Sequence, residues 1–135
     1  MKLYATRLTP GTDLKPAIAS FAKAHSITAG VIVSSVGSLS EVTFRLAGAK
    51  PGHQPSFHKE GEYEILTLNG TVNSDDMHLH LAVSDSTGAV IGGHLKGGCI
   101  VKTTVELVIL ADPSQRFNRT PDLFTGFDEL EVRAT

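Results

Sequence analysis

One helical pattern near the N-terminus, followed by strand patterns joined by short turns, is the feature that most constrains the fold of this chain. Leu14, Ile18 and Phe21 recur at helical spacing, which predicts one helix from Leu14 to His25. No comparable helical pattern follows it. Strands that follow one another through short turns pair antiparallel, whereas parallel pairs need long crossovers. The sequence therefore predicts an α+β fold with a mostly antiparallel sheet of about seven strands and one main helix.

The expected strands are short apolar or alternating segments bounded by turn residues. They are Lys2–Leu8, Ala29–Val36, Val42–Leu46, Tyr63–Val72, Met77–Val83, a strand starting at Val90–Ile91, and Cys99–Leu110. Gly37 is expected to end the second of them, and residues 47–57 to form an exposed loop. Residues 1–113 are expected to form one α+β domain. The polar segment 114–135 is expected to be a C-terminal tail, docked or flexible.

Charge and cysteine content restrict the classes of protein. Twelve Lys and Arg face fourteen Asp and Glu, a net charge of −2, which excludes a strongly basic nucleic-acid binder that acts through bulk charge. Cys99 is the single cysteine, so no intrachain disulfide can form, and a reducing cytoplasm is expected. No apolar run approaches the roughly 18 residues of a membrane span, so no membrane association is expected.

Three histidines form the main candidate site. His78 and His80 share one face of their strand, with Cα atoms about 6.6–6.8 Å apart. A hairpin centred on Ser86 would place His78 opposite His94 and His80 opposite Gly92. Three imidazoles with an open fourth position form a known zinc arrangement. The alternative is that these are ordinary polar strand residues that face water or neighbouring side chains.

Two further features bear on this site. Glu106, on the closing strand, is a candidate fourth ligand, outer hydrogen-bond acceptor or general base, or else an ordinary surface carboxylate. Gly92-Gly93 would leave room beside the histidines for backbone approach or for a ligand. The longer run Gly92–Gly98 lacks the P-loop spacing, and is typical of an anion-binding nest or of a bent hairpin end.

An ordered set of segments resembles the plant-and-prokaryote-conserved (PPC) domain family. The set comprises Val36–Ser40 with Arg45 after it, Gly61–Thr71, His78–Leu81, Gly92–Leu95 and Thr104–Ile109. In order and spacing, the resemblance covers about Leu3 to Leu110, nearly the whole chain. The resemblance implies a compact α+β domain that assembles as a homotrimer. In plants the domain follows AT-hooks, Arg-Gly-Arg-Pro arms that bind the minor groove, and serves self-association, partner binding and transcriptional control. Single-domain prokaryotic members are described as DNA-binding proteins because of this similarity alone.

The resemblance also assigns residues. Some family members bind metal near the histidines that match His78, His80 and His94. The resemblance therefore implies a metal site at these three residues, and zinc is the expected ion. The family's partner-contact hexapeptide matches Gly61, Glu62, Tyr63, Glu64, Ile65 and Leu66, although Glu62 stands where plant members usually carry Arg. The sequence has no Arg-Gly-Arg-Pro run, so direct DNA binding is not expected.

Two hypotheses follow, from different functional classes. The first is a homotrimeric PPC-type interaction protein, a DNA-associated regulator by resemblance, with a zinc or small-ligand site at the three histidines. Strands with apolar residues on both faces, such as Ile32-Val33, favour subunit packing. The alternative is a zinc-dependent enzyme of hydrolase type, with His78, His80 and His94 holding zinc and a bound water as nucleophile. An interaction protein that is not an enzyme is the expected class.

Overall fold

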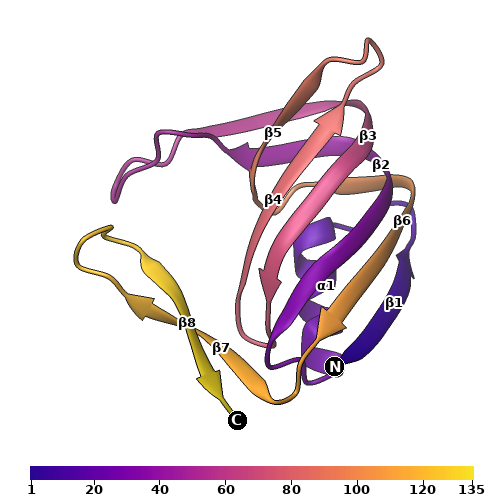
Figure 1. Ribbon diagram of the computed structural model, residues 1–135. Helices are drawn as coiled ribbons and strands as arrows, with labels where there is room; N and C mark the ends of the chain where they lie inside the picture. The colour runs from indigo at the N-terminus through magenta and orange to yellow at the C-terminus, as the bar shows by residue number, and fades with distance from the viewer.

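The single helix packs inside a strongly curved antiparallel sheet, and a separate two-stranded arm leaves the sheet at the C-terminus (Figure 1). The computed structural model describes residues 1–135. Its elements are β1 (Lys2–Leu8), α1 (Leu14–Ala24), β2 (Gly30–Arg45), β3 (Ser56–Val72), β4 (Met77–Ser84), β5 (Val90–Leu95), β6 (Ile100–Ala111), β7 (Gln115–Pro121) and β8 (Asp128–Ala134). The α+β class with a mostly antiparallel sheet is thus confirmed.

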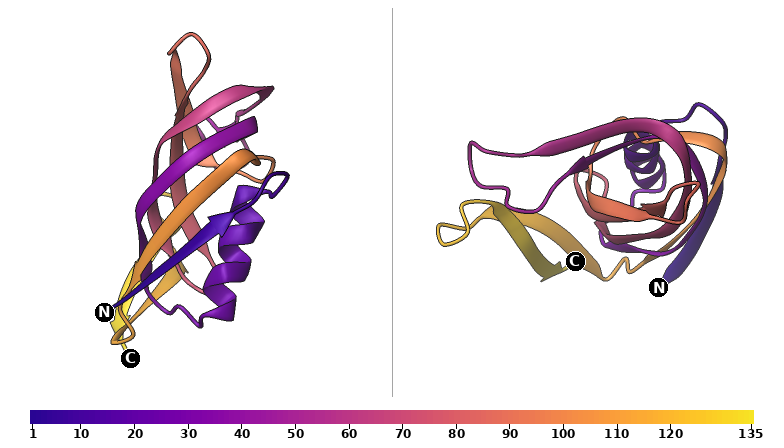
Figure 2. Two further views of the ribbon diagram at one scale, coloured as in Figure 1. Left: turned by 90° about the vertical axis from the view of Figure 1, so that its right-hand side faces the viewer. Right: turned by 90° about the horizontal axis from the view of Figure 1, so that it is seen from above.

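The order of the main sheet is β1-β6-β2-β3-β4-β5, and all its pairings are antiparallel. The end of β2 also pairs with β5 through Phe44↔Leu95 and Arg45↔His94, which curls one end of the sheet back on itself. Seen from above, the strands wrap around α1 (Figure 2). No helix is long and apolar enough to cross a bilayer.

The core lies between the helix and the inner face of the sheet. Leu14, Ile18 and Ala22 form one fully buried stripe of α1. They belong to a cluster of 22 buried residues that includes Leu79 and Leu81 of β4. Because side chains alternate along a strand, burying Leu79 and Leu81 turns the residues between and before them outward. The outer face of β4 therefore carries the histidines.

The prediction that Gly37 separates two strands was wrong, because β2 continues through it as one strand of 16 residues. The register with β6 shifts near Gly37, as at a β-bulge. A Cβ atom at Gly37 would lie 1.9 Å from the carbonyl oxygen of Thr104, and Gly37 has a φ of +156°. Glycine is needed here because the two backbones approach closely, so this glycine marks an irregularity within a strand.

The C-terminal segment forms an antiparallel hairpin, with Phe117 opposite Val132. The tail expected for residues 114–135 thus contains two strands that were not predicted from the sequence. The hairpin, called the arm below (115–134), is attached at its base, where the Phe117 amide donates to the Thr28 carbonyl and Asn73 Nδ2 donates to the Phe117 carbonyl. Its tip approaches the β2–β3 connection, since a Cβ at Gly126 would lie 2.8 Å from Pro51 Cγ. In Figure 1 the arm runs from the end of β6 toward that connection.

Candidate metal centre

Three imidazoles converge on the outer face of the β4–β5 hairpin. His78 and His80 extend from β4 and His94 from β5, and one nitrogen of each ring lies within 4.8 Å of the others. The Nε2 atoms of His78 and His80 are 3.2 Å apart. Without a metal, one of these nitrogens donates a hydrogen bond to the other. His78 and His80 are exposed and His94 is partly buried, so the cluster is open on one side.

The predicted register of the hairpin was wrong by two residues. His80, and not His78, lies opposite His94, and Ala82 lies opposite Gly92. The connection is longer than expected, because the Asp85 amide donates to the Ala89 carbonyl and the Asp85 carboxylate accepts from the Thr87 and Ala89 amides. A shift of two residues keeps every side chain on its face, whereas a shift of one would have separated the histidines.

Burial and neighbouring cations favour the neutral imidazoles. Partial burial lowers the pKa of His94 to about 4, with further lowering by the charges of Arg45 and His78. Burial also lowers the pKa of His78, helped by His80 and by Arg119. At neutral pH both rings therefore have a nitrogen lone pair, which is the form that binds metals.

The donor set fits a zinc-type ion. Imidazole nitrogens bind Zn²⁺ at about 2.0–2.1 Å, so two ligands of a tetrahedral ion lie roughly 3.3–3.4 Å apart. The 3.2 Å separation of the His78 and His80 Nε2 atoms is close to that spacing. Three histidines would leave a fourth coordination position open, as in catalytic or ligand-binding zinc sites rather than closed structural ones.

Residues outside the predicted set surround the cluster. A hollow of about 290 Å³ is bounded by His78 and His94 together with Arg45 of β2, Arg119 of β7 and Glu129 of β8. Sequence reasoning missed the last two because it left their segment without strands. Alternation of Leu130 and Val132 with charged residues was the signal that could have predicted β8.

Arg119 connects the arm to the histidine end of β4. Its Nη2 donates to Thr71 Oγ1 at 2.8 Å, and its Nε lies 3.4 Å from Asp76 Oδ2. Asp76 immediately precedes β4, and its other carboxylate oxygen accepts from the Met77 amide. The arm is therefore tied to the end of β3 and to the connection that leads into β4, the strand that carries His78 and His80.

The structure does not bring Glu106 to the histidines. Glu106 is exposed on β6, between Arg7 of β1 and Val36 of β2, and it is absent from the group of converging ligand atoms. The placement expected for a fourth ligand or general base is therefore not found. The alternative interpretation of Glu106, a surface carboxylate, fits its position.

The hexapeptide Gly61–Leu66 lies on β3 with alternating exposure. Tyr63 and Ile65 are 4% and 7% exposed and belong to the core. Glu62, Glu64 and Leu66 face outward, and Glu62 forms an ion pair with Lys102. A partner on this face could therefore touch only the outward-facing side chains, while Tyr63 and Ile65 hold the strand in place.

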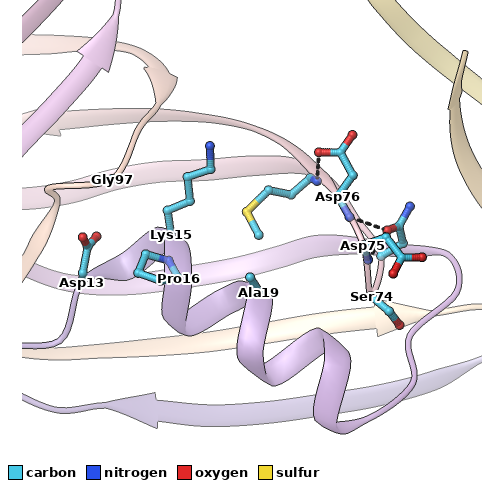
Figure 3. A pocket seen from close by; sticks show the side chains of 10 residues that line it. Asp13, Lys15, Pro16, Ala19, Ser74, Asp75, Asp76 and Gly97 are labelled. Atoms are coloured by element: carbon cyan, nitrogen blue, oxygen red, sulfur yellow. Dashed lines mark hydrogen bonds between the residues drawn. The ribbon is translucent and has the colours of Figure 1, made fainter.

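A larger hollow of about 450 Å³ lies between α1 and the β3–β4 connection (Figure 3). Asp13, Lys15 and Asp76 are among its lining residues. Asp13 Oδ2 accepts from the Gly98 amide, and the Leu14 amide donates to the Cys99 carbonyl. These bonds fasten the start of α1 to the β5–β6 connection, which gives Asp13 a structural role in this hollow.

The family model for the Plants and Prokaryotes Conserved (PCC) domain matches residues 1–111. The chain belongs to this family. The expected PPC resemblance is thereby confirmed, and the histidine cluster lies within the matched region. The arm lies beyond it.

A bifunctional protein GlmU from Synechococcus sp. (strain JA-2-3B'a(2-13)) is 43% identical over 133 residues. That alignment covers 98% of this chain but 20% of the relative, so the chain spans about a fifth of the relative's length. A hypothetical protein from Salmonella has a TM-score of 0.93 at 38% identity, covering 98% of this chain and 94% of that one. Because the Salmonella alignment covers 98% of this chain, it includes most of the arm.

Two other solved structures carry functional descriptions. A Bacteroides thetaiotaomicron protein, provisionally described as DNA-binding, has a TM-score of 0.83 at 26% identity and covers 96% of this chain and 91% of that one. A protein of Archaeoglobus fulgidus described as metal-containing has a TM-score of 0.84 at 24% identity and covers 97% of this chain and 94% of that one. At its level of identity, the Archaeoglobus likeness establishes the shared fold alone.

Proposed function

We propose that this PPC-domain chain is an interaction protein that binds a zinc-type divalent ion through His78, His80 and His94. The observation that carries the proposal is the convergence of three imidazole nitrogens within 4.8 Å on one hairpin. The spacing of the His78 and His80 nitrogens and the open fourth position support a metal that takes an additional ligand. The metal-containing description of the Archaeoglobus neighbour is consistent with this proposal.

We further propose that the functional unit is a homotrimer. Val33, Val36 and Leu66 lie on the central strands β2 and β3, and are 51%, 60% and 54% exposed. Exposed apolar groups on the middle strands of a sheet are typical of an interaction surface. A second copy of the chain would cover this face, and the family resemblance supplies the number of subunits.

The association with DNA is proposed to be indirect. The net charge of −2 disfavours sequence-independent attraction to phosphate backbones, which needs clustered Lys and Arg. We propose that a protein partner contacts the outward side chains Glu62, Glu64 and Leu66 and links the trimer to transcriptional regulation.

A cytoplasmic location is also proposed, since Cys99 is the single cysteine and is a free thiol. Residues 1–113 would form the interacting domain, and residues 114–135 the C-terminal tail that contains the arm.

Metal content tests the central proposal. The chain is purified without a histidine tag or chelator, and zinc is measured by elemental analysis. About one zinc per chain is expected in the wild type, and a large loss in His78→Ala, because two imidazoles bind far more weakly than three. His53→Ala is the matched control, since His53 is exposed in the loop and only its backbone bonds Lys50. Equal zinc in wild type and His78→Ala, or none in either, contradicts the proposal.

A further inference from the structure

Arg45 lies beside the histidine cluster without a carboxylate partner. It is the last residue of β2 and pairs with His94 across to β5. None of the four ion pairs in the structure involves it. Its Nη2 lies 3.5 Å from His94 Nδ1, a contact at the outer limit of a hydrogen bond. Most of the five guanidinium donors therefore remain available.

An aromatic ring holds this guanidinium in place. The Phe127 ring, in the turn between β7 and β8, has its centroid 5.7 Å from Arg45 Cζ, which is within the range of a cation–π contact. The arm thus supports Arg45 from one side without neutralising it. An arginine held in one orientation loses less conformational freedom when it binds a ligand.

Arg45 borders a hollow of about 390 Å³ that contains no carboxylate. The other lining residues are Leu46, Ala47, Gly48, Ala49, His80, Gly92, Gly93 and His94. Gly92 and Gly93 are required by close strand packing, since Cβ atoms there would lie 2.4 Å from the Leu81 oxygen and 2.6 Å from the Arg45 oxygen. The small residues of the loop form the remaining boundary, so cationic and imidazole groups are the only ionisable ones here.

The acidic residues of the region border the adjoining hollow, on the His78 side. Asp76, Asp128 and Glu129 line that second space. Asp76 is already engaged by Arg119 and by the Met77 amide. The two hollows share Arg45 and His94 but differ in charge. Three carboxylates and three cations line the hollow on the His78 side, whereas Arg45 is the only Arg, Lys, Asp or Glu that lines the hollow beside His80.

We propose that the hollow between Arg45, His80 and His94 binds a small oxyanion, either a carboxylate or a phosphate, with Arg45 donating to two of its oxygens. The planar guanidinium fork matches both anions, whereas an ammonium group acts as a point charge. This inference rests on the proposed function, because His80 and His94, which border the hollow, are two of the three proposed metal ligands. It specifies the ligand class that the proposed site takes.

Calorimetric titration at constant ionic strength tests the subsite. Inorganic phosphate and acetate are titrated separately into zinc-loaded protein, and the two experiments show which anion is preferred. One anion per chain is expected, with binding weakened about tenfold or more in Arg45→Gln. Arg45→Lys keeps the charge but not the fork and is expected to be intermediate. Arg116→Gln is the matched control, an exposed arginine outside both hollows, and should bind as wild type does.

Zinc measured on the same samples separates the two claims. Two results with zinc-loaded protein would overturn the oxyanion subsite and leave the metal site standing. Either neither anion binds, or each anion binds to Arg45→Gln as tightly as to wild type. If wild type holds no zinc, the proposed function fails. The same titration on metal-free protein then tests the oxyanion subsite alone. The subsite is supported if Arg45→Gln still weakens anion binding, and it is overturned if Arg45→Gln binds the anions as wild type does. Circular dichroism confirms that each variant is folded.

Discussion

Cys99 is held in the thiol form by its surroundings. The side chain is fully buried, and its Sγ accepts from the Thr43 amide at 3.3 Å and donates to the Thr43 carbonyl at 3.4 Å. Burial is the main cause that raises the pKa of Cys99 from 9.0 to about 11. The hydrogen bond from the Thr43 amide opposes this rise, and the charges of Asp13 and Glu41 add to it. The thiolate is the reactive species, so the native thiol should be unreactive at pH 8.

We predict that iodoacetamide at pH 8 modifies Cys99 about 100-fold more slowly in the native protein than in urea, from the pKa difference alone. Mass spectrometry of timed samples measures both rates. Because the pKa is higher in the folded state, the unfolded chain loses its proton first, and stability should fall as pH rises from 9 to about 11. Cys99→Ala should lack this component of the decline. Rapid modification of the native protein would contradict the buried position.

The face of each histidine was predictable from sequence, but the pairing between the strands was not. Alternation along Met77–Val83 determines that His78 and His80 point together, because Leu79 and Leu81 must be buried. The register depends on the length of the hairpin turn, which Asp85 extends by accepting bonds from two amides. Local side-chain hydrogen bonds of this kind leave only a weak signal in a sequence.

At the scale of the element, the lack of a side chain at Gly37 lets the backbones of β2 and β6 approach closely. We predict that Gly37→Ala lowers the free energy of unfolding by about 1–3 kcal/mol, because the new Cβ overlaps the Thr104 carbonyl and the positive φ is strained. Gly97→Ala is the control, since its Cβ would meet only Asp13 Oδ2, at 3.8 Å. Urea unfolding compares the two variants. Equal midpoints for them would show that the bulge relaxes without cost.

The arm depends on a few contacts made by side chains. We predict that Arg119→Ala, which loses the bonds to Thr71 and Asp76, speeds hydrogen exchange at the arm amides while the exchange of β2 and β6 stays unchanged. Arg133→Ala is the control, because its partner Glu131 lies on the same strand of the arm. Mass spectrometry of peptic fragments measures the exchange. Unchanged arm protection in Arg119→Ala would mean that the backbone bonds at Thr28 suffice.

Such contacts also explain why the arm was not predictable. Its inward contacts join residues far apart in the chain, such as Asn73 with Phe117 and Thr28 with Gln115, so no local pattern encodes them. Arg119 and Glu129 reach the histidines only because this hairpin forms. Arg45 was in an expected strand, but its place beside His94 depends on the additional β2–β5 pairing.

At the scale of the whole molecule, the exposed apolar face of β2 and β3 predicts assembly. In a monomer Val33, Val36 and Leu66 would stay in contact with water, at a cost of about 25 cal/mol for each Å² of apolar surface. Val36→Glu would place a charge on this face, and burying an unpaired charge in an interface is unfavourable. We predict that light scattering gives about three times the 14.3 kDa chain mass for wild type and a single chain mass for Val36→Glu.

Val90→Glu is the matched control for this prediction. Val90 is 59% exposed, close to the value for Val36, but it lies at the start of β5 next to the β4–β5 turn. The same valine-to-glutamate change there should leave the mass of the assembly unchanged. Dissociation by both variants would point to a general effect of added charge, and dissociation by neither would exclude this face as the interface. Zinc content measured on the dissociated Val36→Glu protein then shows whether one chain holds the metal alone, as expected from three ligands on one hairpin.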